Sequence, residues 1–273
     1  MTATPIPRTL ALSLHGDLDV SQIDELPPGR TPIRTAMITG SNREEAYELI
    51  REEVEKGQRA YVVLPLVEES EKMDLRSAVD VHRQLADEVF PDLQVGLLHG
   101  RLASADKQAV IKAFACGETS VLVSTTVVEV GVDVPEASVM VIDHADRFGL
   151  AQLHQLRGRV GRGAAASHCL LINDSRNPLA RQRLEVLVRS TDGFEIAEMD
   201  LRLRGPGQVL GTRQSGLPDL ALASLADDGS VLEEAREEAA DILREDPELR
   251  DHVILSRLLD EQRSRVTSAA QLN

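Results

Sequence analysis

The stretch AYVVLPLV, residues 60–67, is a continuous apolar run with high strand propensity. A strand that is covered on both faces of a parallel sheet has this composition, because neither of its sides meets water. The preceding segment, REEAYELIREEVEKG (43–57), places Ala46, Ile50 and Val54 on one helical stripe. The following segment, LRSAVDVHRQLADEVF (75–90), has helical spacing again. Residues 60–67 are therefore predicted to form a buried strand between two helices.

The same alternation of strand and helix continues over much of the chain. Ser41 or Asn42 is expected to cap the first helix, and Ser104 to cap the segment ADKQAVIKAFACG. The further strand candidates are IRTAMITG (33–40), LQVGLLHG (93–100), SVLVSTT (120–126), SVMVIDH (138–144) and HCLLIN (168–173). Strands alternating with helices predict an α/β fold, a parallel sheet with helices on both faces.

A helical extension is predicted after this α/β region. RQRLEVLVRS (181–190) and FEIAEMDLRLRG (194–205) have the spacing of two short helices. Ser230 is expected to cap the next helix, and Pro247 to start the last one. PPGR (27–30) has the composition of a linker. The predicted organisation is a leading segment and linker (1–30), an α/β domain (31–176) and a helical extension (177–273).

Composition limits the classes of function. The chain of 273 residues has a net charge of -15, only 2% aromatic residues and no Trp, which disfavours both a general basic DNA coat and a stacking platform for bases. The charge is uneven, because residues 144–214 contain 11 arginines and 7 acids, whereas residues 227–251 contain 11 acids and 3 arginines. The basic middle segment still permits contacts with phosphates.

Membrane and metal sites are not expected. The sequence has no apolar run near the length of a membrane span and no secretory signal. Cys116 and Cys169 are far apart and form no CxxC pair, so we expect packing residues and no structural zinc. A cytoplasmic protein is the default expectation.

An arginine-rich segment, QLHQLRGRVGRG (152–163), carries the strongest chemical signal. It places Arg157, Arg159 and Arg162 close together in an acidic chain. Arg159 and Arg162 are three residues apart and would share a face of a helix. Two converging guanidiniums suit the γ-phosphate of a nucleotide. The alternative is an arginine-rich helix start that is solvated or paired with surface acids. Without a nucleotide we expect a mobile loop or pairing with local acids such as Asp143 and Asp146.

Three segments leave strands at their carboxyl ends: HGRL (99–102), STTVVEVGVDVP (124–135) and DHADRFGLAQLHQLRGRVGRG (143–163). Ligands of open parallel sheets bind beyond these ends. We therefore expect all three segments at that edge. In STTVVEVGVDVP (124–135), Asp133 could accept a hydrogen bond from a ribose hydroxyl, and Thr125 and Thr126 could donate to a phosphate. Their ordinary alternative is a capping Thr pair and a turn Asp. In HGRL (99–102), the lone histidine is more often structural than catalytic.

The sequence also lacks parts of a complete nucleotide site. No G-x-x-x-x-G-K-[ST] loop is present. DELP (24–27) and DEVF (87–90) follow no apolar strand, so neither is interpreted as a Mg²⁺-binding acidic box. The segment 152–163 supplies arginines for a γ-phosphate, but the chain has no loop to cradle the phosphates and no carboxylate to hold Mg²⁺.

Five segments, in order, resemble helicase motifs III to VI of superfamily 2: TATPIPRTLAL, YVVLPLVEES, LLHGRL, VLVSTTVVEVGVDVPEASVMVI and QLHQLRGRVGRG. The version here is similar to the RecG family of branch-migrating DNA helicases. The transcription-repair coupling factor shares much of the same run. The segment DGFEIAEMDLRLRGPGQVLGTRQSG (192–216) favours the RecG family, since it resembles that family's translocation motif.

The resemblance implies a RecA-like second motor domain that closes over ATP and Mg²⁺ held mainly by a first motor domain. The implied catalytic residues are Arg159 and Arg162. The implied ATP-binding residues are Gly131, Asp133, Gln155 and Gly158. The implied DNA-binding or translocation residues are His99, Arg101, Thr125, Thr126, Arg202, Arg204, Arg213 and Gln214.

The implied whole protein is a monomeric ATP-dependent helicase that remodels replication forks and Holliday junctions, with branched DNA as its partner. The first motor domain and the fork-splitting wedge domain are not found in this sequence, so we expect a C-terminal fragment that does not hydrolyse ATP alone. The second interpretation is a noncatalytic module that binds DNA or protein through residues 144–214. A Rossmann-type enzyme is disfavoured because no G-x-G-x-x-G follows a first strand.

Overall fold

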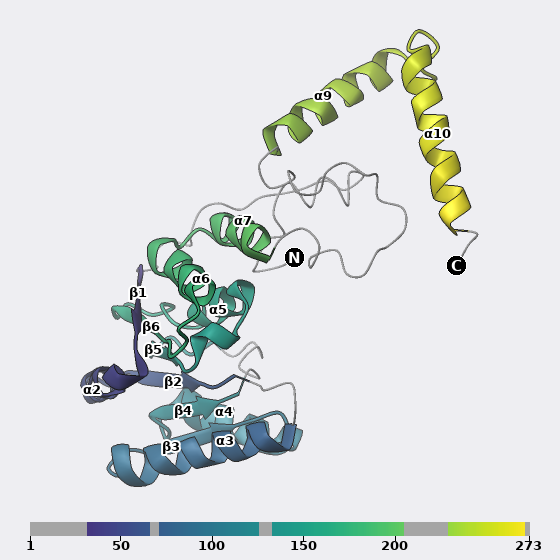
Figure 1. Ribbon diagram of the computed structural model, residues 1–273. Coiled ribbons are helices and arrows are strands. Elements are labelled where there is room, and N and C mark those ends of the chain that lie inside the picture. The colour runs from purple at the N-terminus through teal and green to yellow at the C-terminus, as the bar shows by residue number, and fades with distance from the viewer. Residues whose placement is uncertain (1–31, 66–70, 126–132, 205–228, 271–273) are drawn as a thin grey trace. The chain divides into compact units, whose positions relative to one another are not determined.

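A computed structural model describes residues 32–65, 71–125, 133–204 and 229–270 (Figure 1). The chain divides into two compact units, and among the described residues the division falls between Ile196 and Ala197. The first unit contains the sheet and its helices. The second contains helices.

The first unit is built on a six-stranded sheet in which every neighbouring pair of strands is parallel. The strands are β1 (Ile33–Ile38), β2 (Arg59–Val63), β3 (Val95–Leu98), β4 (Val121–Ser124), β5 (Ala137–Ile142) and β6 (Ser167–Ile172), in the order β1-β6-β5-β2-β4-β3. All six predicted strands are therefore confirmed, and so is the parallel sheet. The predicted strand at 60–67 is shorter than expected, because β2 ends at Val63.

Helices and helical turns lie between the strands, and one more helix, α6 (Pro178–Arg189), follows the last strand. Those between the strands are η1 (Gly40–Asn42), α2 (Arg43–Glu55), α3 (Glu71–Gln84), the π-helical turn η2 (Leu85–Val89), α4 (Ser104–Cys116), η4 (Ala145–Arg147) and α5 (Leu150–Arg157). Asn42 occupies the predicted N-cap position of α2, but its side chain makes no capping hydrogen bond. The expectation that Ser104 caps α4 was wrong, because Ser104 is the first helical residue and Ala103 occupies the cap position.

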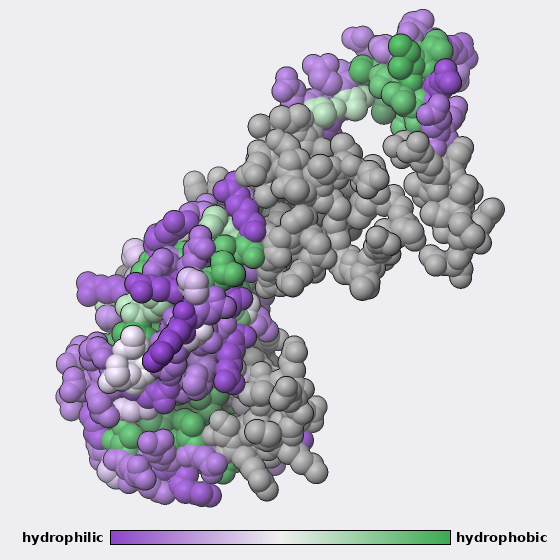
Figure 2. Space-filling view, viewed as in Figure 1, coloured by the Kyte–Doolittle hydropathy of each residue, from purple (hydrophilic) through white to green (hydrophobic). Residues whose placement is uncertain are grey.

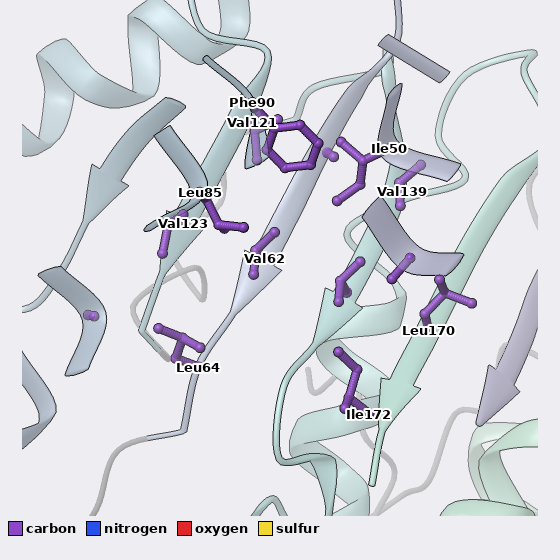
Figure 3. Close-up of a cluster of buried hydrophobic side chains, with 14 residues drawn as sticks. Ile50, Val62, Leu64, Leu85, Phe90, Val121, Val123, Val139, Leu170 and Ile172 are labelled. Atoms are coloured by element: carbon purple, nitrogen blue, oxygen red, sulfur yellow. The ribbon is translucent and has the colours of Figure 1, made fainter. Parts of the chain in front are cut away.

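One face of the sheet carries a large apolar core (Figure 3). Alternate residues of β2, including Val62, point to this face, because side chains alternate along a strand. They pack with Ile50 of α2 and Phe90, which follows η2. The remaining members from the other strands include Val121, Val123, Val139, Val141, Leu170 and Ile172. Burial of this face holds α2 and α3 on the sheet.

The opposite face of the sheet has its own helix layer. Tyr61 lies between Ala60 and Val62 and therefore points to this face, where its ring packs against Phe114 of α4 with centroids 4.7 Å apart. Cys169 of β6 is fully buried, which raises the pKa of its thiol to about 12, and the nearby positive charge of Arg157 of α5 opposes that rise. Cys169 is therefore a packing residue, as expected, whereas Cys116 is exposed, so the expectation was wrong for Cys116. Helices thus cover both faces, which confirms the predicted fold class.

The second unit continues from α7 (Gly193–Arg204), whose first residues lie in the first unit, to α9 (Gly229–Glu245) and α10 (Val253–Ala270). The expectation that Pro247 starts the last helix was wrong, since α10 begins at Val253. The Asp246 carboxylate accepts hydrogen bonds from the backbone N–H groups of Arg250 and Asp251 at 2.9 and 2.8 Å. Leu249 also has a positive φ of 53°, which no helix interior accommodates.

Apolar side chains gather on the surface at the turn between α9 and α10 (Figure 2). The large exposed apolar residues of these helices are Leu243, Val253, Ile254, Leu255, Leu258 and Leu259. No helix among the described residues combines the length and the apolar character that crossing a bilayer requires.

Candidate nucleotide and DNA sites

The loop after α5, residues 158–163, positions the two predicted catalytic arginines. Helix α5 ends at Arg157, and the N–H groups of Arg159 and Val160 donate to Leu156 O and Arg157 O in tight turns. Val160 is fully buried and anchors the loop, and Gly161 adopts a φ of 76° that other residues rarely reach. Arg159 and Arg162 are therefore on a turned loop. The expectation that they share a helical face was wrong.

Arg162 makes the main polar contact of this loop. Its Nη1 lies 3.1 Å from Oδ1 of Asp133, and its Nε donates to Gly158 O at 3.2 Å. The loop is packed tightly against the segment of Asp133, because a Cβ atom at Gly163 would lie 2.3 Å from the carbonyl oxygen of Pro135. The structure thus brings together Asp133, Gly158 and Arg162, which sequence reasoning assigned to one site.

This cluster lies at the amino ends of the strands. Asp133 and Pro135 come just before β5, and Gly163 comes just before β6. The expectation that all three candidate segments gather beyond the carboxyl ends was therefore wrong for these residues. The physical reason is the crossover connection: the segment that links two parallel strands carries the chain back to the edge where strands begin. Residues at the two ends of one connection therefore reach opposite edges.

Tyr61 is a site residue that sequence reasoning missed. It is 4% exposed in β2. Burial raises its pKa to about 12, while the positive charges of Arg159 and Arg162 oppose this rise and the negative charge of Asp133 adds to it. The phenol thus lies within the electrostatic reach of both arginines and of Asp133. A tyrosine inside an apolar strand carries no signal in the sequence that would distinguish it from a core residue.

Arg157 does not belong to this cluster, although it is adjacent to it in the sequence. It is 3% exposed, and its Nη1 donates to the carbonyls of Leu187 and Ser190. The pairing acid of the cluster also differs from the expectation. Arg162 pairs with Asp133, whereas Asp143 pairs with Arg43 at 2.6 Å. The backbone oxygen of Asp146 accepts a hydrogen bond from Arg183 at 2.7 Å.

A second cluster lies at the carboxyl ends of β3 and β4. These strands pair with Leu98 opposite Ser124, so the residues that follow them, His99 and Thr125, are brought together, and Thr125 N donates to Leu98 O at 3.2 Å. Nδ1 of His99 and Oγ1 of Thr125 are buried without a hydrogen-bond partner. Burial lowers the pKa of His99, and the charges of Lys107 and Arg101 lower it further. A neutral imidazole and a hydroxyl at this edge therefore lack hydrogen-bond partners, and surrounding protein atoms enclose both groups.

The remaining predicted site residues are distributed as follows. Gln155 is on α5, Arg101 is in the turn after β3, and Arg202 is exposed on α7 in the second unit. Arg204 is the last residue of α7. Gly131, Thr126, Arg213 and Gln214 lie outside the described residues. In the part of the chain that the structure describes, no group of three or more His, Cys, Asp or Glu side chains could hold a metal ion.

Two family models match the chain, one in the region of the sheet and the arginine loop and one in the region of α7, α9 and α10. The model of the helicase conserved C-terminal domain matches residues 42–164. The model of ATP-dependent DNA helicase RecG, domain 3, C-terminal, matches residues 190–271. Together, the two matches correspond to the C-terminal part of a RecG helicase. The second match covers the segment by which the sequence favoured RecG over the transcription-repair coupling factor.

Individual RecG proteins are similar over most of this chain. An ATP-dependent DNA helicase RecG from Synechocystis is 62% identical over 252 residues, which are 92% of this chain and 30% of the relative. RecG from Thermotoga maritima is 49% identical over 93% of this chain and 33% of the relative. The structure of a RecG bound to a three-way DNA junction matches with a TM-score of 0.67 and 48% identity, over 85% of this chain and 30% of that chain. The chain thus spans about a third of the length of these relatives.

Proposed function

We propose that this chain is the second motor domain and translocation segment of an ATP-dependent DNA helicase that remodels forks and Holliday junctions. The observation that carries the proposal is the loop 158–163 of this RecG-like chain, which holds Arg162 at Asp133 with Arg159 beside it. A RecG relative has been seen with a three-way DNA junction, so we propose branched DNA as the partner. We further propose that the protein is monomeric and cytoplasmic.

The arginine cluster fits the phosphates of ATP. Arg162 is 29% exposed and is paired with a carboxylate that is 62% exposed, so a phosphate can replace that carboxylate without uncovering a buried charge. Arg159 and Arg162 would stabilise the charge that develops on the γ-phosphate during transfer. Asp133 would then accept from the ribose, and Gly131, Gln155 and Gly158 would line the nucleotide.

Magnesium would have to be held outside the described part of this chain, which offers no cluster of carboxylates for it. The first motor domain of the complete helicase would supply these ligands together with the phosphate-cradling loop. When bound, Mg²⁺ neutralises phosphate charge. This chain's own contribution is to place two guanidiniums.

The carboxyl edge of β3 and β4 fits a DNA backbone. Thr125 Oγ1 would donate to a phosphate, and the neutral His99 would donate or accept through Nδ1, once the protein atoms that enclose these two groups move aside on binding. Arg101 and Thr126 would add to this surface. Arg202, Arg204, Arg213 and Gln214 would act in the translocation segment. The nucleotide cluster and this DNA cluster lie at opposite edges of one rigid sheet, so domain closure on ATP would move the DNA contacts with it.

The proposal is tested in a chimera in which this chain replaces the matching segment of the Synechocystis relative. We expect DNA-stimulated ATP hydrolysis that falls at least about 10³-fold in the Arg162→Gln variant. The isolated chain should bind DNA weakly and show no DNA-stimulated turnover. The noncatalytic module would be supported instead if the chimera is inactive and the isolated chain binds DNA with an affinity that neither Arg162→Gln nor nucleotide changes.

A further inference from the structure

Arg157 is a buried arginine that the arginine cluster does not use. Its side chain lies at the end of α5, and Nη1 donates to Leu187 O at 2.8 Å and to Ser190 O at 2.7 Å. Both acceptors lie at the end of α6, since Leu187 is in its last turn and Ser190 is its C-cap. One side chain therefore connects the ends of two helices.

The chemistry of this contact is specific. Carbonyl groups in the last turn of a helix lack partners within the helix, and the helix dipole makes that end negative. A guanidinium satisfies two of them at once. Burying a charge is unfavourable unless it is well bound, so an apolar side chain would be the simpler way to fill this space. The presence of Arg157 therefore indicates that the relative position of the two helix ends matters, in addition to the filling of the space between them.

The two ends that Arg157 connects are functionally distinct. It directly precedes the loop 158–163, which ends the match to the helicase domain at residue 164. Ser190 begins the match to the RecG-specific region. The pKa of His154, one turn earlier on α5, is lowered by burial and by the charge of Arg157, while the charge of Asp192 raises it. The helix that carries the arginine loop is thus attached to the start of the translocation segment.

We infer that Arg157 is a positioning residue that holds the loop carrying Arg159 and Arg162 at a set place relative to the junction of α6 and α7. The bonds go to backbone carbonyls, so they fix the two chain segments themselves. The consequence for activity rests on the proposed function, since a loop displaced by even about 1 Å would place its arginines badly for phosphate transfer.

Hydrogen exchange on the chain itself tests the positioning without any activity. In Arg157→Gln we expect exchange to rise at least about tenfold at the amides of Arg159, Val160 and Ser190, with no change in the central strands. The matched control is Arg181→Gln, an exposed arginine of α6 that pairs only with Glu185 at the surface. If Arg157→Gln does not fold, Arg157→Lys takes its place. The inference is overturned if amide exchange rises neither in the loop 158–163 nor at Ser190, or if it rises equally across the sheet.

Kinetics in the chimera provide the second readout. We expect Arg157→Gln to lower kcat for DNA-stimulated ATP hydrolysis about tenfold while KM for ATP stays within about twofold, because the arginines act on the transferring phosphate. Arg157→Lys should be intermediate and Arg181→Gln unchanged. If the unsubstituted chimera hydrolyses ATP and Arg157→Gln leaves its kcat unchanged, the positioning role of Arg157 is overturned. A wild-type chimera without turnover would instead contradict the proposed function, and the exchange experiment would still decide the placement of Arg157.

Discussion

Arg162 and Asp133 are 29 residues apart in the sequence and form an ion pair in which Nη1 lies 3.1 Å from Oδ1. The pair joins the loop after α5 to the segment before β5. Both side chains are partly exposed, so water screens the attraction between them. The contact therefore places Arg162 without binding it strongly, which suits a group that must exchange a carboxylate for a phosphate.

The ion pair should contribute little to stability. We expect Asp133→Asn and Arg162→Gln each to change the free energy of unfolding of the chain by less than about 1 kcal/mol, because exposed pairs contribute little. Urea denaturation followed by circular dichroism measures this. A loss of several kcal/mol in either variant would mean that the pair is a structural contact, and that the loss of ATP hydrolysis in Arg162→Gln reports on folding.

The packing of Gly163 against Pro135 should be far more sensitive. Gly163→Ala places a Cβ atom 2.3 Å from the Pro135 oxygen, so we expect destabilisation by about 1–3 kcal/mol as the two segments move apart. Gly158→Ala is the matched control, since its φ is -67° and its Cβ would lie 3.4 Å from the nearest atom, Gln155 O. Thermal unfolding of the two variants compares them. Equal melting temperatures would show that the close approach at Gly163 is not required.

The buried His154 should make stability depend on pH. Burial, together with the smaller effect of the charge of Arg157, lowers its pKa to about 4, against an ordinary value of 6.5. Between these values the unfolded chain binds the proton and the folded chain does not, so stability is full above pH 6.5 and is lost as pH falls toward 4. We expect this residue to account for about 1–2 kcal/mol of that loss.

Other groups also titrate in this range, including His99 and His168, whose pKa values are lowered in the same direction. The comparison is therefore between the wild-type chain and His154→Gln, measured by denaturation at pH 4.5 and 7. The variant should lose less stability on acidification. An identical loss in both proteins would show that His154 is protonated in the folded state.

The tyrosines provide a direct measurement of the electrostatics around the arginine cluster. The chain has two Tyr and no Trp, so its ultraviolet absorbance reports Tyr ionisation alone. Burial raises the pKa of Tyr61 to about 12 and also raises that of Tyr47. In Tyr47→Phe the single remaining transition should lie near pH 12. In Arg159→Gln and Arg162→Gln it should move higher, because each removes a positive charge that favours the phenolate. A transition at the ordinary pH of 10 would place Tyr61 in water.

Much of the fold could be predicted because its signals are local. Continuous apolar runs such as 60–67 mark strands that are covered on both sides, and their alternation with helical stripes implies parallel pairing. The errors occurred where the signal depends on a few residues. Ser104 lies inside α4, and the turn around Asp246 delays α10 until Val253. At Asp246, side-chain hydrogen bonds to backbone N–H groups compete with the helix, and such bonds are not visible in periodicity.

The sequence by itself determined the α/β fold class, the RecG resemblance and the identity of the two candidate phosphate-binding arginines, because motif spacing and hydrophobic periodicity are properties of neighbouring residues. Only the tertiary structure decided which partners these residues have. It separated Arg157 from Arg159 and Arg162, paired Arg162 with Asp133, added Tyr61 and placed the cluster at the amino edge of the sheet. These contacts join segments that are distant in the chain. Packing decides the path of each crossover connection, and that path determines which segments meet.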